Sequence, residues 1–416
     1  MSIELCNQSE CTGCGLCSAL CPNGAIMMVK DSNGFSYPRL EPNICIACGK
    51  CLTLCPVLSH NNRLDSPVPE SFACWARDPI LRKRSSSGGL FSVFAEQILA
   101  KHGVVYGVIF DTELKPIFSR TESETGLVPM CGSKYVEANA INLFSQIATD
   151  LNRGRPVLFS GTPCQNAALK NYVTELELPT SFLYQIDFIC HGVSSPALWE
   201  SFVRYIELKY CDELRNVYFR DKSIGGWKSP AIRFSFKHRK DKFVPWSTAR
   251  FYPENAFVTC YHKNLTLRSA CARCRWTGLP REGDITLADA QSLYHHPDFH
   301  RETRDGISMI LLNSSKGKTL YAESVRQIVS MSRPFAETRL PAAPVILHPL
   351  RESFLIDAQR LDFSRLMRRY RKLLSPPFRF ATVLKEIVQF LLGPKFTLSV
   401  REAIESVRYG LVRRKR

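Results

Sequence analysis

Two short cysteine runs near the start of the chain constrain its fold more than any other feature. Residues 11–22 read CTGCGLCSALCP, and residues 45–56 repeat the pattern as CIACGKCLTLCP. Each run has the spacing C-x2-C-x2-C-x3-C followed by proline, which is typical of bacterial-type [4Fe–4S] ligand loops. The sequence therefore predicts a small ferredoxin-type domain over residues 1–60 that binds two such clusters.

The last cysteine of each run is expected to serve the opposite cluster. In two-cluster ferredoxins the fourth cysteine crosses over in this way. The first predicted ligand set is Cys11, Cys14, Cys17 and Cys55, and the second is Cys45, Cys48, Cys51 and Cys21.

Zinc or disulfide bonds explain these cysteines less well. Structural zinc sites take their ligands in pairs, and disulfide frameworks belong mainly to short secreted chains. The first ten residues show neither a basic start nor an apolar segment typical of a signal peptide. No apolar run is long enough to predict a spanning helix. We therefore expect a cytoplasmic protein whose thiols stay reduced.

The middle of the chain has the pattern of an α/β core. The chain has 416 residues, of which 45% are hydrophobic and 22% charged, which is sufficient for a sizeable core. Residues 61–70, NNRLDSPVPE, are typical of a linker. From 71 to 355, strand-like apolar runs alternate with helical patterns. The clearest predicted strands cover 103–110, 156–161, 182–190 and 306–313.

Positive charge is concentrated in a predicted helical, basic tail over residues 356–416. The net charge of the chain is +17, and residues 360–416 carry 15 Lys or Arg against 4 Asp or Glu. The stripes at 380–396 and 400–416 suit a helix on the anionic inner face of a membrane, or a hairpin packed on the core. We do not expect nucleic acid as a partner, because the tail lacks regularly interleaved aromatic residues and a known binding motif.

Three turns rich in small residues follow predicted strands, where α/β proteins commonly bind cofactors. They are SSSGG at 85–89, SGTPC at 160–164 and CHGVSSP at 190–196. None matches a dinucleotide-binding G-x-G-x-x-G motif or a P-loop. Each turn alone is also what an ordinary helix cap requires.

Four later cysteines suggest a third cluster. Cys164 and Cys190 end predicted strands, and Cys271 and Cys274 form a C-x2-C pair. If these loops converge, the four thiols suit a further [4Fe–4S] cluster; half of a zinc site or two buried thiols is an equal alternative for the pair. The remaining cysteines are interpreted as small hydrophobic residues: Cys6, Cys74, Cys131, Cys211 and Cys260.

Several stretches between residues 72 and 313 together resemble the coenzyme F420 hydrogenase/dehydrogenase beta-subunit family, in its form with an N-terminal ferredoxin domain. In the family's order they are SSSGGLF (85–91), GVVYGVIFD (103–111), GSKYV (132–136), LFSGTPCQNAAL (158–169), DFICHGVSSPALW (187–199), FRDKSIGGWKS (219–229), LRSACARC (267–274) and GDITLAD (283–289). The resemblance implies an FAD enzyme that passes electrons between iron–sulfur clusters and a second partner.

The resemblance also implies the residues near FAD. They are Ser87, Gly88, Gly89, Ser133, Lys134, Tyr135, Gly161, Thr162 and Lys228. Lys134 and Lys228 would pair with the pyrophosphate or raise the flavin potential, or are solvated surface charges. His191 is the candidate catalytic proton donor because imidazole titrates near neutral pH; a turn-stabilising hydrogen bond is the equal alternative.

The substrate side departs from the family pattern. Relatives often have Gly-Asp followed by an aromatic residue and Gly, whereas residues 287–296 read LADAQSLYHH. Coenzyme F420 is therefore not carried over as the substrate. Relatives with this layout resemble accessory proteins of surface-polysaccharide synthesis, which implies a small-molecule or glycan substrate. We expect a redox partner protein or reduced ferredoxin; the alternative is an electron-transfer subunit that docks on a separate enzyme and has no substrate of its own.

Overall fold

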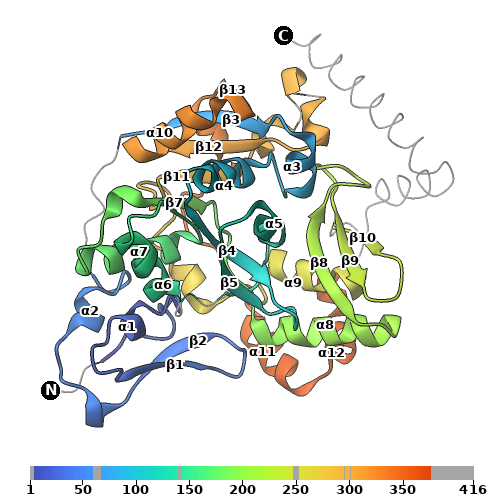
Figure 1. The fold of residues 1–416 in the computed structure, drawn as a ribbon. Helices are drawn as coiled ribbons and strands as arrows, with labels where there is room; N and C mark the ends of the chain where they lie inside the picture. Colours follow the sequence, from blue (N-terminus) through green and yellow to red (C-terminus); the bar gives the residue numbers. More distant parts are fainter. Residues whose placement is uncertain are drawn as a thin grey trace.

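The largest element is an eight-stranded sheet, in the order β13-β3-β12-β11-β7-β6-β4-β5 (Figure 1). The computed structural model describes residues 4–59, 67–138, 140, 143–246, 253–294, 296–299 and 301–375. The strands are β3 (Glu70–Ala76), β4 (Val104–Phe110), β5 (Pro116–Thr121), β6 (Val157–Ser160), β7 (Leu183–Phe188), β11 (Ile285–Asp289), β12 (Ser308–Leu312) and β13 (Ile328–Ser332). The predicted α/β core is confirmed, and β4, β6, β7 and β12 fall within the four predicted strand runs.

Five of these strands end at the same edge of the sheet. The neighbours β4, β6, β7 and β11 pair in parallel, and β12 is antiparallel to both β11 and β3. Strand β3 therefore runs in the same direction as the four parallel strands. The loops that follow β3, β6, β7 and β11 meet at this edge, which is where open α/β sheets bind ligands.

Helices cover both faces of the sheet because its strands are apolar on both sides. Val105 of β4 packs into one buried cluster, and its neighbours Val104 and Tyr106 pack into another. The first cluster includes residues of α4 (Leu90–Ala100) and α10 (Ser315–Ser324). The second includes residues of α6 (Leu143–Asn152) and α7 (Pro163–Glu175). Alternating side chains on one strand thus fix helices on opposite faces.

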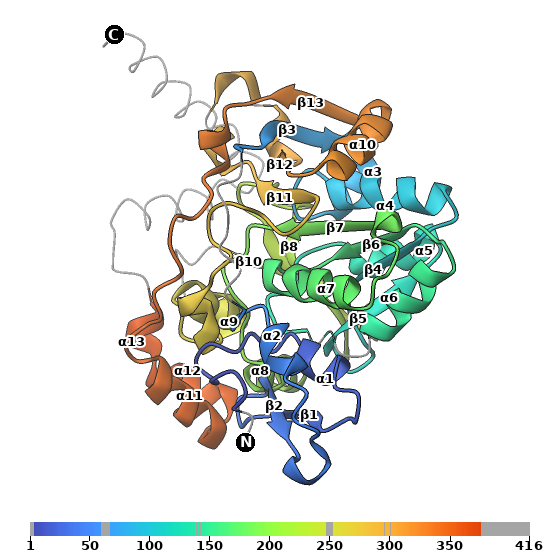
Figure 2. The ribbon, with the colours of Figure 1, turned by 90° about the vertical axis from the view of Figure 1, so that its left-hand side faces the viewer.

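The predicted ferredoxin-type domain is present at the N-terminus and packs on the core. Its elements are α1 (Leu16–Ala19), β1 (Ile26–Lys30), β2 (Ser36–Leu40) and α2 (Lys50–Thr53). Leu16 and Leu20 enter the same buried cluster as α6 and α7. Figure 2 shows the domain, in blue, at one end of the molecule near α7 and α8 (Pro196–Tyr210). The domain is therefore seated against the core.

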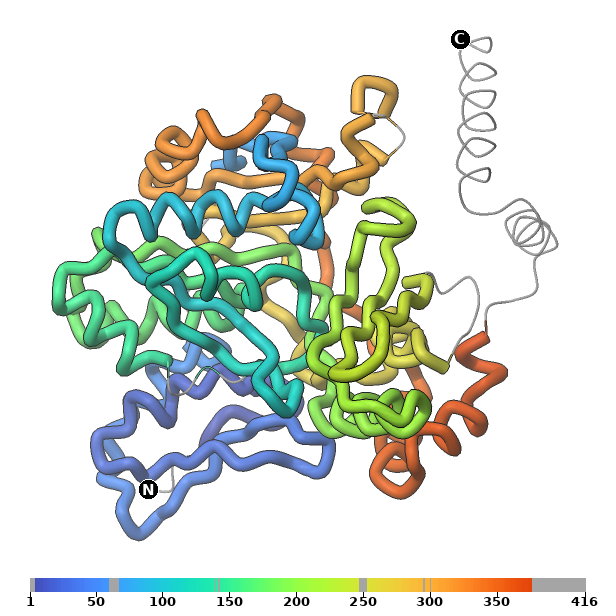
Figure 3. The backbone as a smooth tube through the Cα atoms, turned by 45° about the vertical axis from the view of Figure 1, so that its right-hand side comes forward, coloured from blue at the N-terminus to red at the C-terminus, as the bar shows by residue number. Residues whose placement is uncertain are grey.

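A second, three-stranded antiparallel sheet lies beside the main one. It consists of β8 (Leu214–Asp221), β9 (Ala231–Phe236) and β10 (Lys242–Pro245), in the order β10-β9-β8. Its buried side packs with α8 and α9 (Ala256–His262), and with the later helices α11 (Arg351–Arg360), α12 (Phe363–Arg369) and α13 (Arg371–Leu374). Figure 3 shows α11 and α12, in red, at the same end of the molecule as the N-terminal domain.

The remaining short helices connect these parts. They are α3 (Pro79–Arg84), α5 (Glu124–Leu127), and the 3-10 helices η1 (Pro42–Ile44), η2 (Val128–Met130), η3 (Thr180–Phe182), η4 (Pro253–Asn255), η5 (Ser269–Arg273), η6 (Gln291–Leu293), η7 (Pro297–Phe299), η8 (Glu302–Arg304), η9 (Val325–Gln327) and η10 (Phe335–Thr338).

Two sequence predictions fall partly or wholly outside the described ranges. Most of the expected linker and both amphipathic stripes of the tail lie there. Within the described part of the chain, no helix is both long and apolar enough to cross a membrane.

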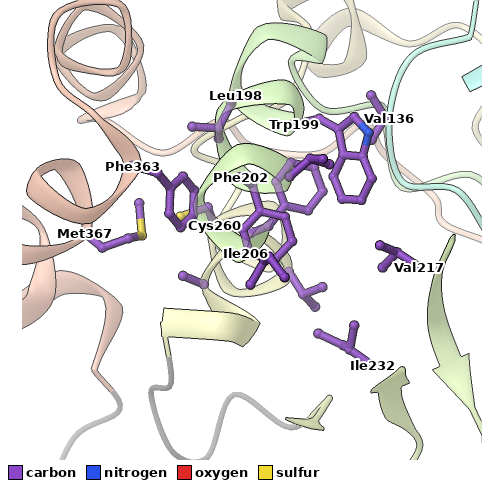
Figure 4. Close-up of a cluster of buried hydrophobic side chains, with 14 of the residues drawn as sticks. Val136, Leu198, Trp199, Phe202, Ile206, Val217, Ile232, Cys260, Phe363 and Met367 are labelled. Carbon is purple, nitrogen blue, oxygen red and sulfur yellow. The ribbon is translucent and has the colours of Figure 1, made fainter. Parts of the chain in front are cut away.

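Replacing Phe202 with alanine is expected to lower the free energy of unfolding by about 3–5 kcal/mol. Phe202 is 1% exposed and lies among Trp199, Ile206 and Phe363 (Figure 4). Leu208 on the same helix is 72% exposed, so Leu208→Ala should change stability by less than about 0.5 kcal/mol. Chemical denaturation of both variants tests this difference. Equal effects would contradict the packing described.

Candidate functional site

The first predicted ligand set comes together in a pocket against the core. Cys11, Cys14, Cys17 and Cys55 all line it. Burial raises the pKa of the Cys17 thiol, and the other three sulfurs raise it further. Burial also raises the pKa of Cys14 to about 12. The fold thus brings the last cysteine of the second run to the first three of the first run.

The atoms around this pocket fit a bound [4Fe–4S] cluster. The Thr12 hydroxyl lines the pocket and is buried without a hydrogen-bond partner in the described structure. The polar backbones of Gly13, Leu16 and Ser18 favour the thiolates of Cys11, Cys14 and Cys17, respectively, against the effect of burial. Backbone groups that stabilise cluster ligands also tune the reduction potential.

Among the described residues, no group of three or more His, Cys, Asp or Glu side chains is arranged to hold a single metal ion.

The second predicted set also comes together, but near the surface. Burial raises the pKa of Cys51, and the charges of Cys48, Cys45 and Cys21 raise it further. The Ala25 N–H donates to the Cys21 sulfur at 3.2 Å, and the Ala47 N–H to the Cys45 sulfur at 3.4 Å. Cys48 is exposed. The two sets thus differ in position: the first is an inner group and the second an outer group.

Cys6 lies beside the inner group. It packs as a partly buried hydrophobic residue, as the sequence predicts, and it also lines the pocket of the inner group. Hydrogen bonding from Cys6 lowers the pKa of Cys55 to about 6 and that of Cys11 to about 7. Its sequence signal is weak: it lies only five positions before Cys11 and belongs to neither repeat.

The four later cysteines converge, as the third-cluster hypothesis requires. Burial raises the pKa of Cys164, and the charges of Cys190, Cys274 and Cys271 add to this shift. Burial likewise raises the pKa of Cys190 to about 12 and that of Cys271 to about 11. Cys164 lies in the first turn of α7, Cys190 follows β7, and Cys271 lies in η5. We call these four residues the third cysteine group.

The inner group and the third group share one apolar cluster. Val57, Ala167 and Trp276 are buried together, and they contact Cys6, Cys55, Cys164 and Cys274. The charge of Cys164 also contributes to the raised pKa of Cys14. Cys51 of the outer group also lines the inner pocket. The three cysteine groups therefore lie in the order outer, inner and third.

Hydrogen bonds bring two of the predicted flavin stretches side by side. Ser86 Oγ accepts from the Ser133 N–H at 2.9 Å and also bonds the Ser133 hydroxyl at 3.1 Å. The Gly88 N–H donates to Ser308 Oγ at 3.0 Å, and Ser87 Oγ donates to the Ile307 carbonyl at 2.8 Å. The loop after β3 is thereby fixed against β12 and against residues 132–135.

A buried lysine also holds the 85–89 loop in place through hydrogen bonds. Lys222 is 7% exposed, and its ammonium donates to the carbonyls of Arg82, Ser87 and Asp305 at 2.5–2.6 Å. Its three donors thus match three acceptors on two chain segments.

Replacing Lys222 with methionine is expected to cost about 2–4 kcal/mol, because three carbonyls lose their donor in a buried place. The expected result also includes a loss of any flavin that the 85–89 loop helps to hold. Thermal unfolding and flavin content of Lys222→Met measure both effects. Lys237→Met, at a lysine that is 45% exposed, is the control. Equal stability of the two variants would contradict this role of Lys222.

The two predicted pyrophosphate-binding lysines are both partly buried, not fully solvated. The Lys134 ammonium donates to the carbonyls of Pro129, Met130, Cys131 and Gly132 at 2.8–3.2 Å. Burial lowers the pKa of Lys134 to about 8. Lys134 is therefore engaged by its own turn, and this conformation does not support its pairing with an outside anion. Lys228 is half-buried and has a partner within the protein.

Tyr135 lies in an aromatic cluster that reaches the third group. Its ring is 4.8 Å from the Tyr261 ring and 5.2 Å from the Trp246 ring. Burial raises the pKa of Tyr261, and the charges of Cys190 and Cys271 contribute to the shift. Tyr261 therefore lies between Tyr135 and the third group.

A charged pair missed by the sequence interpretation adjoins Tyr135. The Arg220 guanidinium forms an ion pair with Asp289. Burial raises the pKa of the Tyr135 and Tyr294 phenols, and the charge of Arg220 opposes this rise. Both Asp289 and Tyr294 belong to the stretch 287–296 that departs from the family pattern. This stretch therefore still supplies polar groups next to Tyr135.

His191, Gly161 and Thr162 are placed nearer the third group. The exposed His191 ring contacts Tyr261 and forms a 2.7 Å hydrogen bond between its Nε2 and Asn264 Oδ1. The Thr162 hydroxyl is 3.1 Å from the Cys164 sulfur. A Cβ on Gly161 would lie 2.7 Å from the Phe159 ring, so this glycine permits a tight internal contact. A catalytic role for His191 stays a prediction.

Comparisons with known proteins agree with the two-part organisation. Residues 154–337 match the family model for the C-terminal part of the coenzyme F420 hydrogenase/dehydrogenase beta chain, and residues 10–58 match the model of a 4Fe-4S dicluster domain. Among solved structures, a chain of the F420-reducing [NiFe] hydrogenase complex from Methanosarcina barkeri is 12% identical. The comparison covers 74% of this chain and 92% of that chain, with a TM-score of 0.45. No curated protein matches the chain.

Proposed function

We propose that this chain is an iron–sulfur flavoprotein oxidoreductase, and the match of residues 154–337 to the C-terminal part of the coenzyme F420 hydrogenase/dehydrogenase beta subunit supports this proposal. The dicluster domain at residues 10–58 makes it an iron–sulfur protein. The proposed reaction passes electrons between two N-terminal [4Fe–4S] clusters and FAD, and reduces or oxidises an organic substrate. The observation that carries this proposal is the contact between the inner cysteine group and the third group.

The proposed cofactors have complementary chemistry. Iron–sulfur clusters supply one-electron transfer, and a flavin couples single electrons to two-electron chemistry. The inner group and the third group would hold their clusters within buried, apolar surroundings that exclude water. The cysteine thiols lose their protons when they bind iron, and the N–H groups around them stabilise the resulting charge.

The outer group is proposed to exchange electrons with a redox partner protein or reduced ferredoxin. Its loop is exposed at Cys48, and Ile44 and Ile46 beside it are 47% and 59% exposed. Exposed apolar side chains next to a redox centre suit transient protein contact. The same surface would serve the alternative function, an electron-transfer subunit that docks on a separate enzyme.

FAD is proposed to lie at the sheet edge, near Ser87, Gly88 and Ser133. One observation there fits a ligand. A Cβ added to Gly132 would meet nothing closer than Ser86 Oγ at 4.0 Å, so space is open beside the loop. Arg220 and Tyr135 would face the organic substrate, a small molecule or a glycan intermediate of surface-polysaccharide synthesis.

Iron, sulfide and released flavin per chain test the proposal after anaerobic purification and reconstitution. About twelve irons with one FAD would support three clusters feeding a flavin. About eight irons with one FAD would remove the third cluster but keep the flavoenzyme. Absence of flavin after reconstitution would reject the enzyme and favour the electron-transfer subunit.

A further inference from the structure

A buried ion pair joins the N-terminal domain to the core. Arg268 is 1% exposed, and its Nη1 donates to Glu137 Oε2 at 2.6 Å. The Glu137 side chain is 7% exposed. Neither residue belongs to the predicted site. Both adjoin functional segments: Glu137 follows the GSKYV stretch, and Arg268 lies three residues before Cys271.

The Arg268 guanidinium uses its other donors on the inner cysteine loop and its neighbouring strand. Its Nε donates to the Cys11 carbonyl at 2.7 Å, and its Nη2 donates to the Ser36 carbonyl at 2.8 Å. Glu137 Oε1 in turn accepts from the Ser36 N–H at 3.1 Å. The pair thus satisfies backbone groups of the N-terminal domain from the core side.

The loop between Cys11 and Cys14 leaves room for the Arg268 guanidinium. A Cβ on Gly13, between Cys11 and Cys14, would lie 2.8 Å from Arg268 Nη1. The Tyr37 ring lies on another side, with its centroid 4.2 Å from the guanidinium carbon. The guanidinium therefore lies in close contact with the backbone of the loop that contains Cys11 and Cys14.

The backbone of Arg268 connects to the third group. Its carbonyl accepts from the Cys271 N–H at 3.0 Å, and its N–H donates to the Val193 carbonyl at 3.0 Å. One residue therefore adjoins both buried cysteine groups.

A buried charge can affect electron transfer in a way that an apolar contact cannot. Well-packed apolar side chains often replace a buried ion pair without loss of stability, so cohesion alone does not require the charge. Reduction adds one negative charge to a cluster. A nearby positive charge in a low-dielectric place stabilises that state, since net charge and hydrogen bonds set cluster potentials.

Building on the proposed function, we propose that Arg268 is a positioning residue that holds the inner and third cysteine groups together and raises the reduction potential of their clusters. Glu137 offsets part of that charge. The two residues thus set how readily electrons enter the buried part of the chain.

Redox titration of the reconstituted protein, followed by EPR, tests this role. Arg268→Met should lower the midpoint potential of an inner cluster by about 59 mV, a tenfold change in the one-electron equilibrium. Glu137→Gln, which keeps the shape of the side chain, should raise it. Arg268→Lys keeps the charge and should stay closer to wild type. Arg365→Met removes the same charge from an arginine of α12 that is 69% exposed, and should cause no shift.

The opposite signs of the two shifts in midpoint potential distinguish an electrostatic effect on the clusters from a purely structural role of the ion pair. A merely structural pair would shift the potential in the same direction in Arg268→Met and Glu137→Gln, or leave it unchanged, and either result overturns the inference. If Arg268→Met does not fold, the direction of the shift in Glu137→Gln decides. Iron content of the wild type is measured first: a chain without clusters overturns the proposed function as well, whereas loaded clusters with unmoved potentials overturn the inference alone.

Discussion

Replacing Cys14 with serine is expected to remove one complete cluster, so that iron content falls by about four atoms per chain. Cys14 lines the inner pocket and packs beside the core residues that α1 contacts. Serine does not supply the soft thiolate that iron–sulfur clusters select. Because the inner group lies between the outer and third groups, electron delivery from an external donor to the substrate should also stop.

Iron analysis and a reductase assay with an artificial electron donor measure this effect. Cys211→Ser is the control, because Cys211 is exposed and caps the end of α8 away from the three groups. The control should keep its iron and its rate. An unchanged reductase rate in Cys14→Ser would reject the inner group as part of the electron path.

Replacing Cys271 with serine is expected to separate electron entry from substrate chemistry. With the proposed third cluster in place, iron should fall from about twelve to about eight atoms per chain, because that cluster loses a ligand. The N-terminal clusters should still accept electrons from dithionite. Reduction of the flavin by those clusters should become much slower, because the third group lies between them and Tyr135.

Stopped-flow absorbance resolves cluster reduction from flavin reduction in this variant. Cys260→Ser is the matched control: Cys260 is also buried and nearby in sequence, but it lies in the hydrophobic core beside α8. It should keep about twelve irons. Full iron content in Cys271→Ser would contradict a cluster at this position.

The sequence predicts the parts of the site that depend on local spacing. Each cysteine run supplies three ligands of one group within a few residues, and the crossover known from two-cluster ferredoxins supplies the fourth, so the pattern indicates the inner and outer groups. Strand runs such as 103–110 are recognisable because β4 is apolar on both faces. The convergence of Cys164 and Cys190 can also be predicted, because both follow strands that pair in parallel and end at the same edge of the sheet.

Long-range contacts were beyond the reach of the same patterns. Arg268 and Glu137 are 131 positions apart, and nothing near either residue indicates the other. Lys134 resembles an anion-binding lysine in sequence, but the turn before it folds back and supplies four carbonyl acceptors. Cys6 lacks a repeated partner, so its approach to Cys11 and Cys55 depends on how the whole domain closes.

The contact between Arg268 and Cys11 has a consequence for biosynthesis. The two residues are separated by 257 positions. At a synthesis rate of about 5–20 residues per second, the cysteine runs leave the ribosome roughly 13–50 s before Arg268 does. During that interval the inner face of the N-terminal domain lacks the arginine that later closes it. Machinery that inserts clusters within this interval meets an open domain, whereas machinery that acts later meets a closed one.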